Sequence, residues 1–121
     1  MGEKMKYMLL VYMDESVMTD AERQDCYVES AQLTQELHSN RQYVSANPLH
    51  PVATATSVRV REGKPLVTDG PFAETREQLG GYFLIDVKNL DEAMAVASRI
   101  PGARRGTIEI RPVVEIAGMP D

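Results

Sequence analysis

The chain has 121 residues and a mass of 13.5 kDa, which suits a single domain with one hydrophobic core. Its formal net charge of −5 and its scattered basic residues argue against nucleic acid as a partner, because binding the phosphate backbone needs a concentrated basic face. The opening apolar run is too short for a signal peptide or a membrane span, and the single cysteine cannot form an internal disulfide, so we expect a cytoplasmic protein. We expect one domain over residues 1–121, with residues 1–4 as a tail or cloning remnant.

The first third of the chain predicts a strand followed by a helix. Residues 5–12 are rich in Leu, Val, Tyr and Met without clean alternation, as in a central strand covered on both faces. Thr19 and Glu22 form a capping-box pattern that starts a helix over residues 20–39. Four residues of this helix fall on one stripe, which predicts that the helix lies on a sheet: Cys26, Ser30, Leu33 and Leu37.

Two reactive side chains of this helix have ordinary structural interpretations. Cys26 has no C-x-x-C partner and no basic residue beside it, and Asp25 opposes thiolate formation, so we interpret Cys26 as a structural thiol rather than a nucleophile. His38 lies near the last turn, where the helix dipole favours a cationic imidazole.

The middle of the chain predicts a stiff loop and a hairpin. Residues 43–47 are a short extended piece, and the two prolines around His50 display it on a loop. Residues 54–61 alternate between apolar and basic side chains, and Glu62-Gly63 turns the chain into a second strand over residues 64–68. The hairpin places Asp69 at the end of a strand, and a carboxylate in this position can project into a cleft.

The last third predicts a strand, a helix and a strand. Residues 80–87 carry apolar side chains on both faces, and Pro112 makes the final strand, residues 106–116, bulge or lie at a sheet edge. Asn89 caps a helix whose predicted apolar side is Leu90, Ala93, Met94, Ala97 and Ile100.

The predicted order is therefore β-α-β-β-β-α-β, which favours an α+β fold: a ferredoxin-like sandwich with both helices on one face of an antiparallel sheet. Apolar residues on both sides of several strands predict that the other face packs against a second copy, giving a homodimer.

The best site candidate is the segment from Thr68 to Gly81, T-D-G-P-F-A-E-T-R-E-Q-L-G-G. Gly70 and Pro71 force a turn, and Phe72 is expected to anchor it. Carboxylates and one cation then cluster beside the turn: Asp69, Glu74, Arg76 and Glu77.

This segment also carries a family resemblance. Asp69-Gly70-Pro71-Phe72, Ala73-Glu74-Thr75, Glu77-Gln78-Leu79-Gly80-Gly81 and Glu109-Ile110-Arg111-Pro112-Val113 resemble the DGPF branch of the YCII-related family, and the similarity runs from about residue 5 to residue 114. The resemblance implies a dimeric α+β barrel, in which the sheets of two subunits pack face to face. It also implies an acid–base pair of histidine and aspartate in the interface-side cleft, for which Asp69 matches by position and His50 is the weaker match.

In that pair, Asp69 would orient His50 and stabilise its cation, and His50 would move a proton near neutral pH. We expect the ligand-binding residues to be Phe72, Glu74, Arg76, Glu77 and Arg111. Structural alternatives stay open for each acid. Asp69 can bond the backbone of its own turn or pair with Arg76 or Arg111, and Glu74 and Glu77 can stabilise the first turn of a short helix after Pro71.

Two functions follow. One is a small acid–base enzyme, similar to a lyase, isomerase or hydrolase, that acts on a small polar metabolite in a dimer cleft. The other is a non-catalytic ligand-binding or regulatory module, which the resemblance links to transcriptional systems built around sigma factors. No cofactor is implied, because His38 and His50 lack zinc spacing and no phosphate-cradling glycine motif is present.

Overall fold

The computed structural model describes residues 3–120; residues 1 and 2 of the predicted tail lie outside the described residues, as does residue 121. The strands and helices are β1 (Met5–Met13), α1 (Asp20–Ser39), β2 (Tyr43–Pro48), β3 (Thr56–Arg61), β4 (Lys64–Asp69), β5 (Gln78–Val87), α2 (Leu90–Ala97) and β6 (Thr107–Pro112). Short 3-10 helices follow three of them: η1 (Glu15–Val17), η2 (Val52–Thr54) and η3 (Pro101–Arg104).

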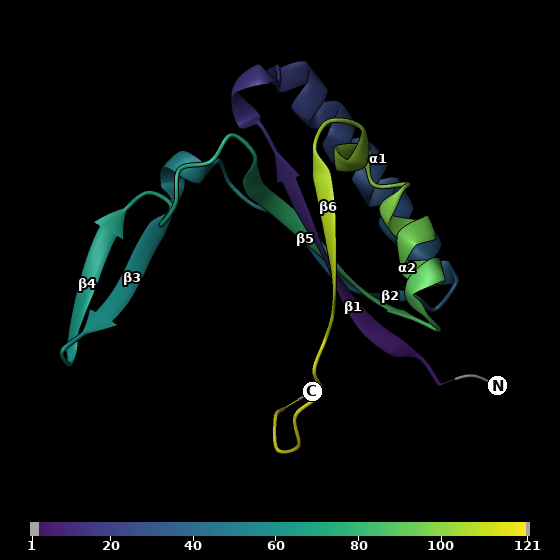
Figure 1. The fold of residues 1–121 in the computed structure, drawn as a ribbon. Coiled ribbons are helices and arrows are strands. Elements are labelled where there is room, and N and C mark those ends of the chain that lie inside the picture. The colour runs from purple at the N-terminus through teal and green to yellow at the C-terminus, as the bar shows by residue number, and fades with distance from the viewer. Residues whose placement is uncertain (1–2, 121) are drawn as a thin grey trace.

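Four strands form the main sheet in the order β2-β5-β1-β6, and each neighbouring pair is antiparallel. Both helices cover the same face of this sheet (Figure 1). The α+β class, the antiparallel sheet and the shared helix face agree with the prediction. No helix within residues 3–120 is both long enough and apolar enough to cross a bilayer.

The predicted strand order is wrong in one respect, because four strands rather than three lie between the helices. Residues 43–47, expected only as an extended piece, begin β2, which pairs with β5 at the sheet edge. Its Ser, Asn and Pro give a weak strand signal, so pairing with β5 rather than local preference makes it a strand. β6 occupies the other edge, as Pro112 predicts, but it ends at Pro112 instead of residue 116.

The hydrophobic core lies between the helices and the sheet. Alternate residues of β1 and β5 point into it, so that Leu9 and Ile85 are completely buried. The predicted apolar side of α2 is partly wrong: Leu90 and Met94 are exposed, whereas Val96 is buried. The other buried core residues are Tyr7, Val11, Leu33, Leu37, Phe83, Val87, Ala93, Ala97 and Ile100.

The cap of α1 confirms the predicted start of the helix. The backbone amide of Glu22 donates to Thr19 Oγ1 at 3.1 Å, and the backbone amide of Thr19 donates to Glu22 Oε1 at 2.9 Å. This reciprocal pair satisfies two amides that would otherwise lack a partner in the helix. The helix therefore begins where the sequence places it.

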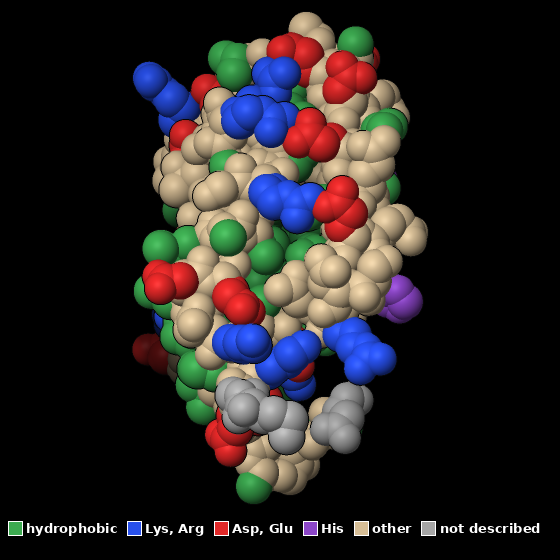
Figure 2. All heavy atoms as spheres, turned by 90° about the vertical axis from the view of Figure 1, so that its right-hand side faces the viewer, with side chains coloured by type: hydrophobic (Ala, Val, Ile, Leu, Met, Phe, Trp, Pro, Cys, Tyr) green, Lys and Arg blue, Asp and Glu red, His purple; other side chains and the backbone are tan. Residues whose placement is uncertain are grey.

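A ladder of ion pairs joins α1 to the segment after α2. Figure 2 views this side of the molecule and shows basic and acidic side chains next to each other along it. The pairs are Glu22–Arg105 at 2.8 Å, Glu29–Arg104 at 2.7 Å, and Glu36–Arg99. Because these side chains are largely exposed, each pair of the ladder contributes little to the stability of the fold.

The hairpin of β3 and β4 forms a separate two-stranded sheet, which we call the arm. It projects from the body on the side away from the helices (Figure 1). Glu62 and Gly63 both have positive φ, as the predicted two-residue turn requires. Every residue of the two strands except Ser57 is exposed.

The arm is amphipathic despite its exposure. The register places Val58 opposite Val67, and Val60 opposite Pro65, on one face. The other face carries the basic residues Arg59, Arg61 and Lys64. An isolated hairpin with an exposed apolar face is marginally stable in water. Contact with another apolar surface would stabilise the arm.

Candidate functional site

The main sheet leaves one face without helices, which we call the open face. Strand alternation puts Met8, Leu10 and Tyr12 of β1 on this face, between the buried core residues. Tyr82 and Leu84 of β5 lie beside them, because Leu10 pairs with Tyr82 and Met8 pairs with Leu84. All of these side chains are half-buried. The open face thus has an apolar floor with two tyrosines.

Tyr82 is held by two side chains of the edge strand β2. Its hydroxyl oxygen lies 2.8 Å from Ser45 Oγ and accepts a hydrogen bond from Asn47 Nδ2 at 3.0 Å. The bond with Ser45, followed by that from Asn47, lowers the pKa of Tyr82, and partial burial opposes the change. Asn47 donates to the Tyr82 oxygen, and Ser45 can do so in one orientation of its hydroxyl group. The hydroxyl proton of Tyr82 can then point toward a ligand on the open face.

Tyr12 has the opposite environment. Its hydroxyl donates a long hydrogen bond, 3.4 Å, to Glu109 Oε1 on β6. Burial raises the pKa of Tyr12, as do the charge and hydrogen bond of Glu109, whereas the charge of Arg111 acts in the other direction. Nearby, Thr107 Oγ1 donates to Glu77 Oε1 at 2.9 Å, so that two carboxylates border one shallow hollow.

The two tyrosines lie diagonally across neighbouring strands. Tyr82 pairs with Leu10, two residues before Tyr12, and a bulge separates Val11 from Tyr12. Diagonal positions of this kind are about 7–8 Å apart between Cα atoms. This face therefore brings together two phenol hydroxyls, of Tyr12 and Tyr82, and two carboxylates, of Glu77 and Glu109.

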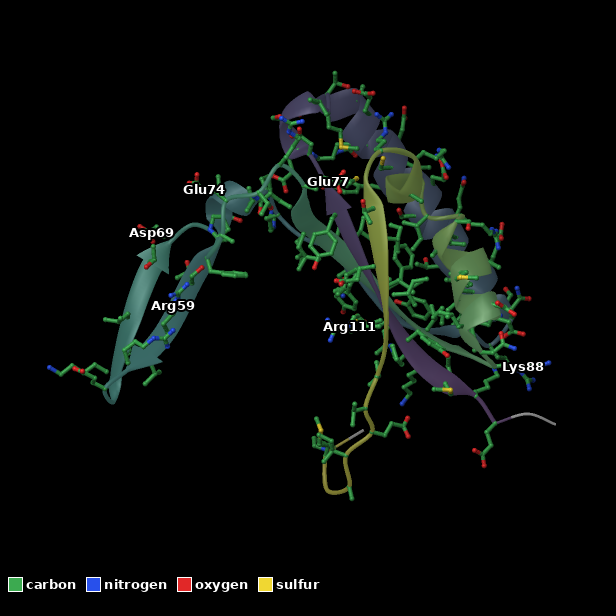
Figure 3. The ribbon with its side chains drawn as sticks, viewed as in Figure 1. Arg59, Asp69, Glu74, Glu77, Lys88 and Arg111 are labelled. Atoms are coloured by element: carbon green, nitrogen blue, oxygen red, sulfur yellow. The ribbon has the colours of Figure 1, made fainter. Side chains whose placement is uncertain are left out.

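The predicted acid–base pair is not joined within one chain. His50 is exposed on the loop after β2, and Asp69 is exposed at the end of β4. No hydrogen bond or ion pair within residues 3–120 connects them, and Figure 3 shows Asp69 on the arm, apart from Glu77 and Arg111. The catalytic roles of His50 and Asp69 stay predictions.

The hydrogen bonds that hold the turn after Asp69 do not involve the Asp69 carboxylate. Gly70 has a φ of +99° and donates its amide to Ala55 O at 2.6 Å, while Ser57 Oγ donates to Gly70 O at 2.8 Å. The expectation that Phe72 anchors the turn is wrong, because its side chain is 80% exposed. The first-turn explanation for Glu74 and Glu77 is wrong too, since residues 71–77 form no helix.

The fold separates the predicted ligand-binding residues. Glu77 joins the open-face cluster through Thr107, and Arg111 lies on the same face of β6, opposite Met8. Glu74 lies toward the arm in Figure 3. The pKa of Asp14 is lowered mainly by hydrogen bonds from Ser16, and the positive charge of Arg76 lowers it further.

Sequence reasoning missed most of the open-face cluster. Residues 5–12 and 80–87 were predicted as strands, but Tyr12 and Tyr82 were given no role in a site. Strand parity could have placed both tyrosines on one face. Their partners come from β2 and β6, and only the sheet order brings those strands next to them: Ser45, Asn47, Thr107 and Glu109.

The environment of Cys26 also differs from the sequence-based view. Arg104 and Arg105, distant in sequence, lie close enough to Cys26 for its thiol to contribute to their raised pKa values, after the larger effects of Glu29 and Glu22. Within the described part of the chain, no three His, Cys, Asp or Glu residues are arranged to hold a metal ion.

Comparison with known proteins places the chain in a family. The model of the YCII-related domain matches residues 5–117. An uncharacterized protein of Rhizobium meliloti (strain 1021) is 39% identical over 118 residues, which cover 90% of this chain and 92% of that protein. The match spans β1 to the segment after β6, so it includes both the open face and the arm. This chain belongs to the YCII-related domain family.

Proposed function

We propose that this protein is a homodimer that binds a small polar metabolite between its open faces and carries out acid–base chemistry on it. The observation that carries this proposal is the hydrogen-bonded cluster on one uncovered face, where Ser45 and Asn47 hold Tyr82, and Glu109 accepts from Tyr12. Tyr82 would donate a proton or hydrogen bond to an oxygen of the ligand. Glu77 or Glu109 would accept a proton, and Arg111 would attract an anionic group.

Two surfaces support the dimer. The floor of the open face contains Met8, Leu10 and Leu84, which remain half-buried without a covering layer. The apolar face of the arm leaves Val58 and Val67 more than 60% exposed. A second copy on the open face would cover the floor and lie next to the arm, because both are on the side away from the helices (Figure 1).

The finer assignments form part of this proposal. The sheet order β2-β5-β1-β6 with two helices on one face supports a ferredoxin-like sandwich, and face-to-face packing of two such sheets would give a dimeric α+β barrel. The Asp69-Gly70-Pro71-Phe72 segment supports the DGPF branch of the family. Asp69 ends β4, and His50 lies in the loop between β2 and η2, so a second copy over the open face is proposed to bring the two into one cleft.

A thermal-shift screen of polar metabolites at several pH values tests the site. A ligand that binds the folded state raises the melting temperature by mass action. We expect a compound that stabilises the wild type to lose most of its effect in Tyr82→Phe and to keep it in Tyr27→Phe, which removes a hydroxyl from α1. If Tyr82→Phe responds as the wild type does to every stabilising compound, the open-face site is wrong.

A second candidate function is a non-catalytic ligand-binding or regulatory module, acting within sigma-factor-associated transcription. The absence of a bond between His50 and Asp69 in the described chain favours it. A compound whose stabilising effect depends on Tyr82, but which the protein does not convert, would support this module over the enzyme.

A further inference from the structure

A second hollow lies on the helix-covered side of the main sheet, between α1 and β2. We call it the α1 groove; it has a volume of about 350 Å³. It exists because the inner stripe of α1 begins with the small residues Cys26 and Ser30, whereas Leu33 and Leu37 fill the core further along. Across from them, β5 contributes glycines and β2 contributes Ala46, so no large side chain occupies the space.

The lining of the α1 groove is uncharged and largely apolar. No Asp, Glu, Lys, Arg or His is among its residues. Three aromatic residues line it besides Tyr82, whose side chain lies on the open face: Tyr27, Tyr43 and Phe83. Polar atoms are few, and they include the hydroxyls of Ser30 and Thr34. Thr34 Oγ1 donates its proton to Ala31 O at 2.7 Å, which leaves its oxygen able to accept a hydrogen bond.

We propose that the α1 groove binds a small uncharged molecule with an aromatic ring and one hydroxyl group. Its volume falls in the range of small-molecule sites, about 300–1,000 Å³. The aromatic lining offers edge-to-face contacts to a ring, and Thr34 can accept the ligand's hydroxyl proton. A charged ligand is disfavoured because the lining has no charged side chain to offset its loss of hydration, and Arg104 and Arg105, near Cys26, are already paired with Glu29 and Glu22.

This groove goes beyond the proposed open-face function. Asn47 and Tyr82 line the groove, but their side-chain hydrogen bond lies on the open face, on the other side of the sheet. The two sites therefore lie on opposite faces of the same strands. The groove is tested separately, with substitutions that leave Asn47 and Tyr82 unchanged.

Benzyl alcohol is a suitable probe, and benzoate is its matched charged control. The direct measurement is NMR of the methyl groups of Ala31 and Ala46, which lie on opposite walls. We expect benzyl alcohol to shift both methyl signals in a saturable manner and benzoate to shift neither. Benzyl alcohol that leaves both signals unmoved up to its solubility limit overturns the proposal, and so does benzoate that binds equally well.

Cys26 provides a second readout, because it is the chain's single cysteine and lines the groove. Iodoacetamide adds one carbamidomethyl group to the thiol with release of iodide and a proton, which mass spectrometry follows. At a benzyl alcohol concentration ten times its Kd, about a tenth of the grooves are empty, so we expect alkylation to slow about tenfold. Alkylation that is unchanged while the methyl signals saturate would place the probe away from Cys26 and contradict the assigned groove.

Filling the groove should abolish both effects. Ser30→Leu adds bulk from α1, and Ser39→Leu makes the same change at an exposed position on the same helix outside the groove. We expect Ser30→Leu to lose the benzyl alcohol shifts of the Ala46 methyl and Ser39→Leu to keep them. Ala31→Leu serves as a second filling variant if Ser30→Leu does not fold. A folded filling variant that binds the probe as the wild type does overturns the proposal.

Discussion

The two faces of strand β1 follow the same alternation but have different environments. Tyr7, Leu9 and Val11 enter a core in which helices cover every side chain. Met8, Leu10 and Tyr12, each one residue further along, lie on a face that no helix covers, beside hydrogen-bonded tyrosines and carboxylates. The difference teaches that alternation decides which face a residue occupies, whereas the elements packed on that face decide whether it becomes core or site.

The largest expected effect comes from comparing neighbouring leucines on the two faces. Leu9 is completely buried, so Leu9→Ala should lower the free energy of unfolding by about 3 kcal/mol, through lost burial and the cavity left behind. Leu10→Ala on the half-buried open face should cost about 1 kcal/mol at protein concentrations that favour the monomer. Urea denaturation measures both. If Leu9→Ala and Leu10→Ala lowered the free energy of unfolding equally at every protein concentration, the two faces would not differ in burial as described.

The proposed dimer gives the next effect. Leu10→Glu would bury a charge without a partner between two open faces, which should cost about 3 kcal/mol of association, or roughly a hundredfold in Kd. Sedimentation or light scattering across a concentration series measures this. Val17→Glu, at an exposed position of η1, is the matched control and should associate as the wild type does. A wild type that remains monomeric at all concentrations would refute the proposed dimer.

The tyrosines sharpen the comparison in alkaline solution. The folded-state pKa of Tyr12 is raised, so its contribution to stability is present below its unfolded pKa, about 10, and is lost as pH rises through the folded value. The pKa of Tyr82 is lowered, so its contribution has the opposite sign and is lost as pH falls through the folded value.

We therefore expect Tyr12→Phe to lose stability less steeply than the wild type above about pH 10, and Tyr82→Phe to lack a stabilising contribution that the wild type gains as pH approaches about 10 from below. Thermal melts between neutral and alkaline pH provide the measurement, with Tyr27→Phe as the control. Identical slopes for Tyr12→Phe and Tyr82→Phe would contradict the opposite environments of the two phenols.

The smallest effect belongs to the helix side of the molecule. The backbone amide of Thr19, and then Arg105, lower the pKa of Glu22 below its usual value, 4.5. The stability that Glu22 contributes is present above that value and is lost as pH falls through the folded pKa. Glu22→Gln should flatten the acid side of the stability curve slightly, which thermal melts between neutral and acid pH would measure. An unchanged acid slope in Glu22→Gln would mean that solvent screens the ladder completely.

Local signals predicted the elements well where a single segment carries the whole signal. The capping box at Thr19 and Glu22, the positive-φ turn at Glu62 and Gly63, and the cap at Asn89 each depend on a few adjacent residues. β2 was underestimated because its hydrogen bonds come from β5, more than thirty residues further along. Phe72 was misplaced for a similar reason: whether an apolar side chain is buried depends on what packs around it.

The sequence by itself determined the α+β class, the positions of the helix caps and the arm's turn, because these depend on local backbone preference and hydrophobic pattern. Only the tertiary structure decided that Tyr82 meets Ser45 and Asn47, and that Tyr12 meets Glu109, because those contacts join strands whose order no local pattern encodes. The same holds for the α1 groove. Small residues at Cys26 and Ser30 leave a hollow only because β5 and β2 present glycines and an alanine opposite them.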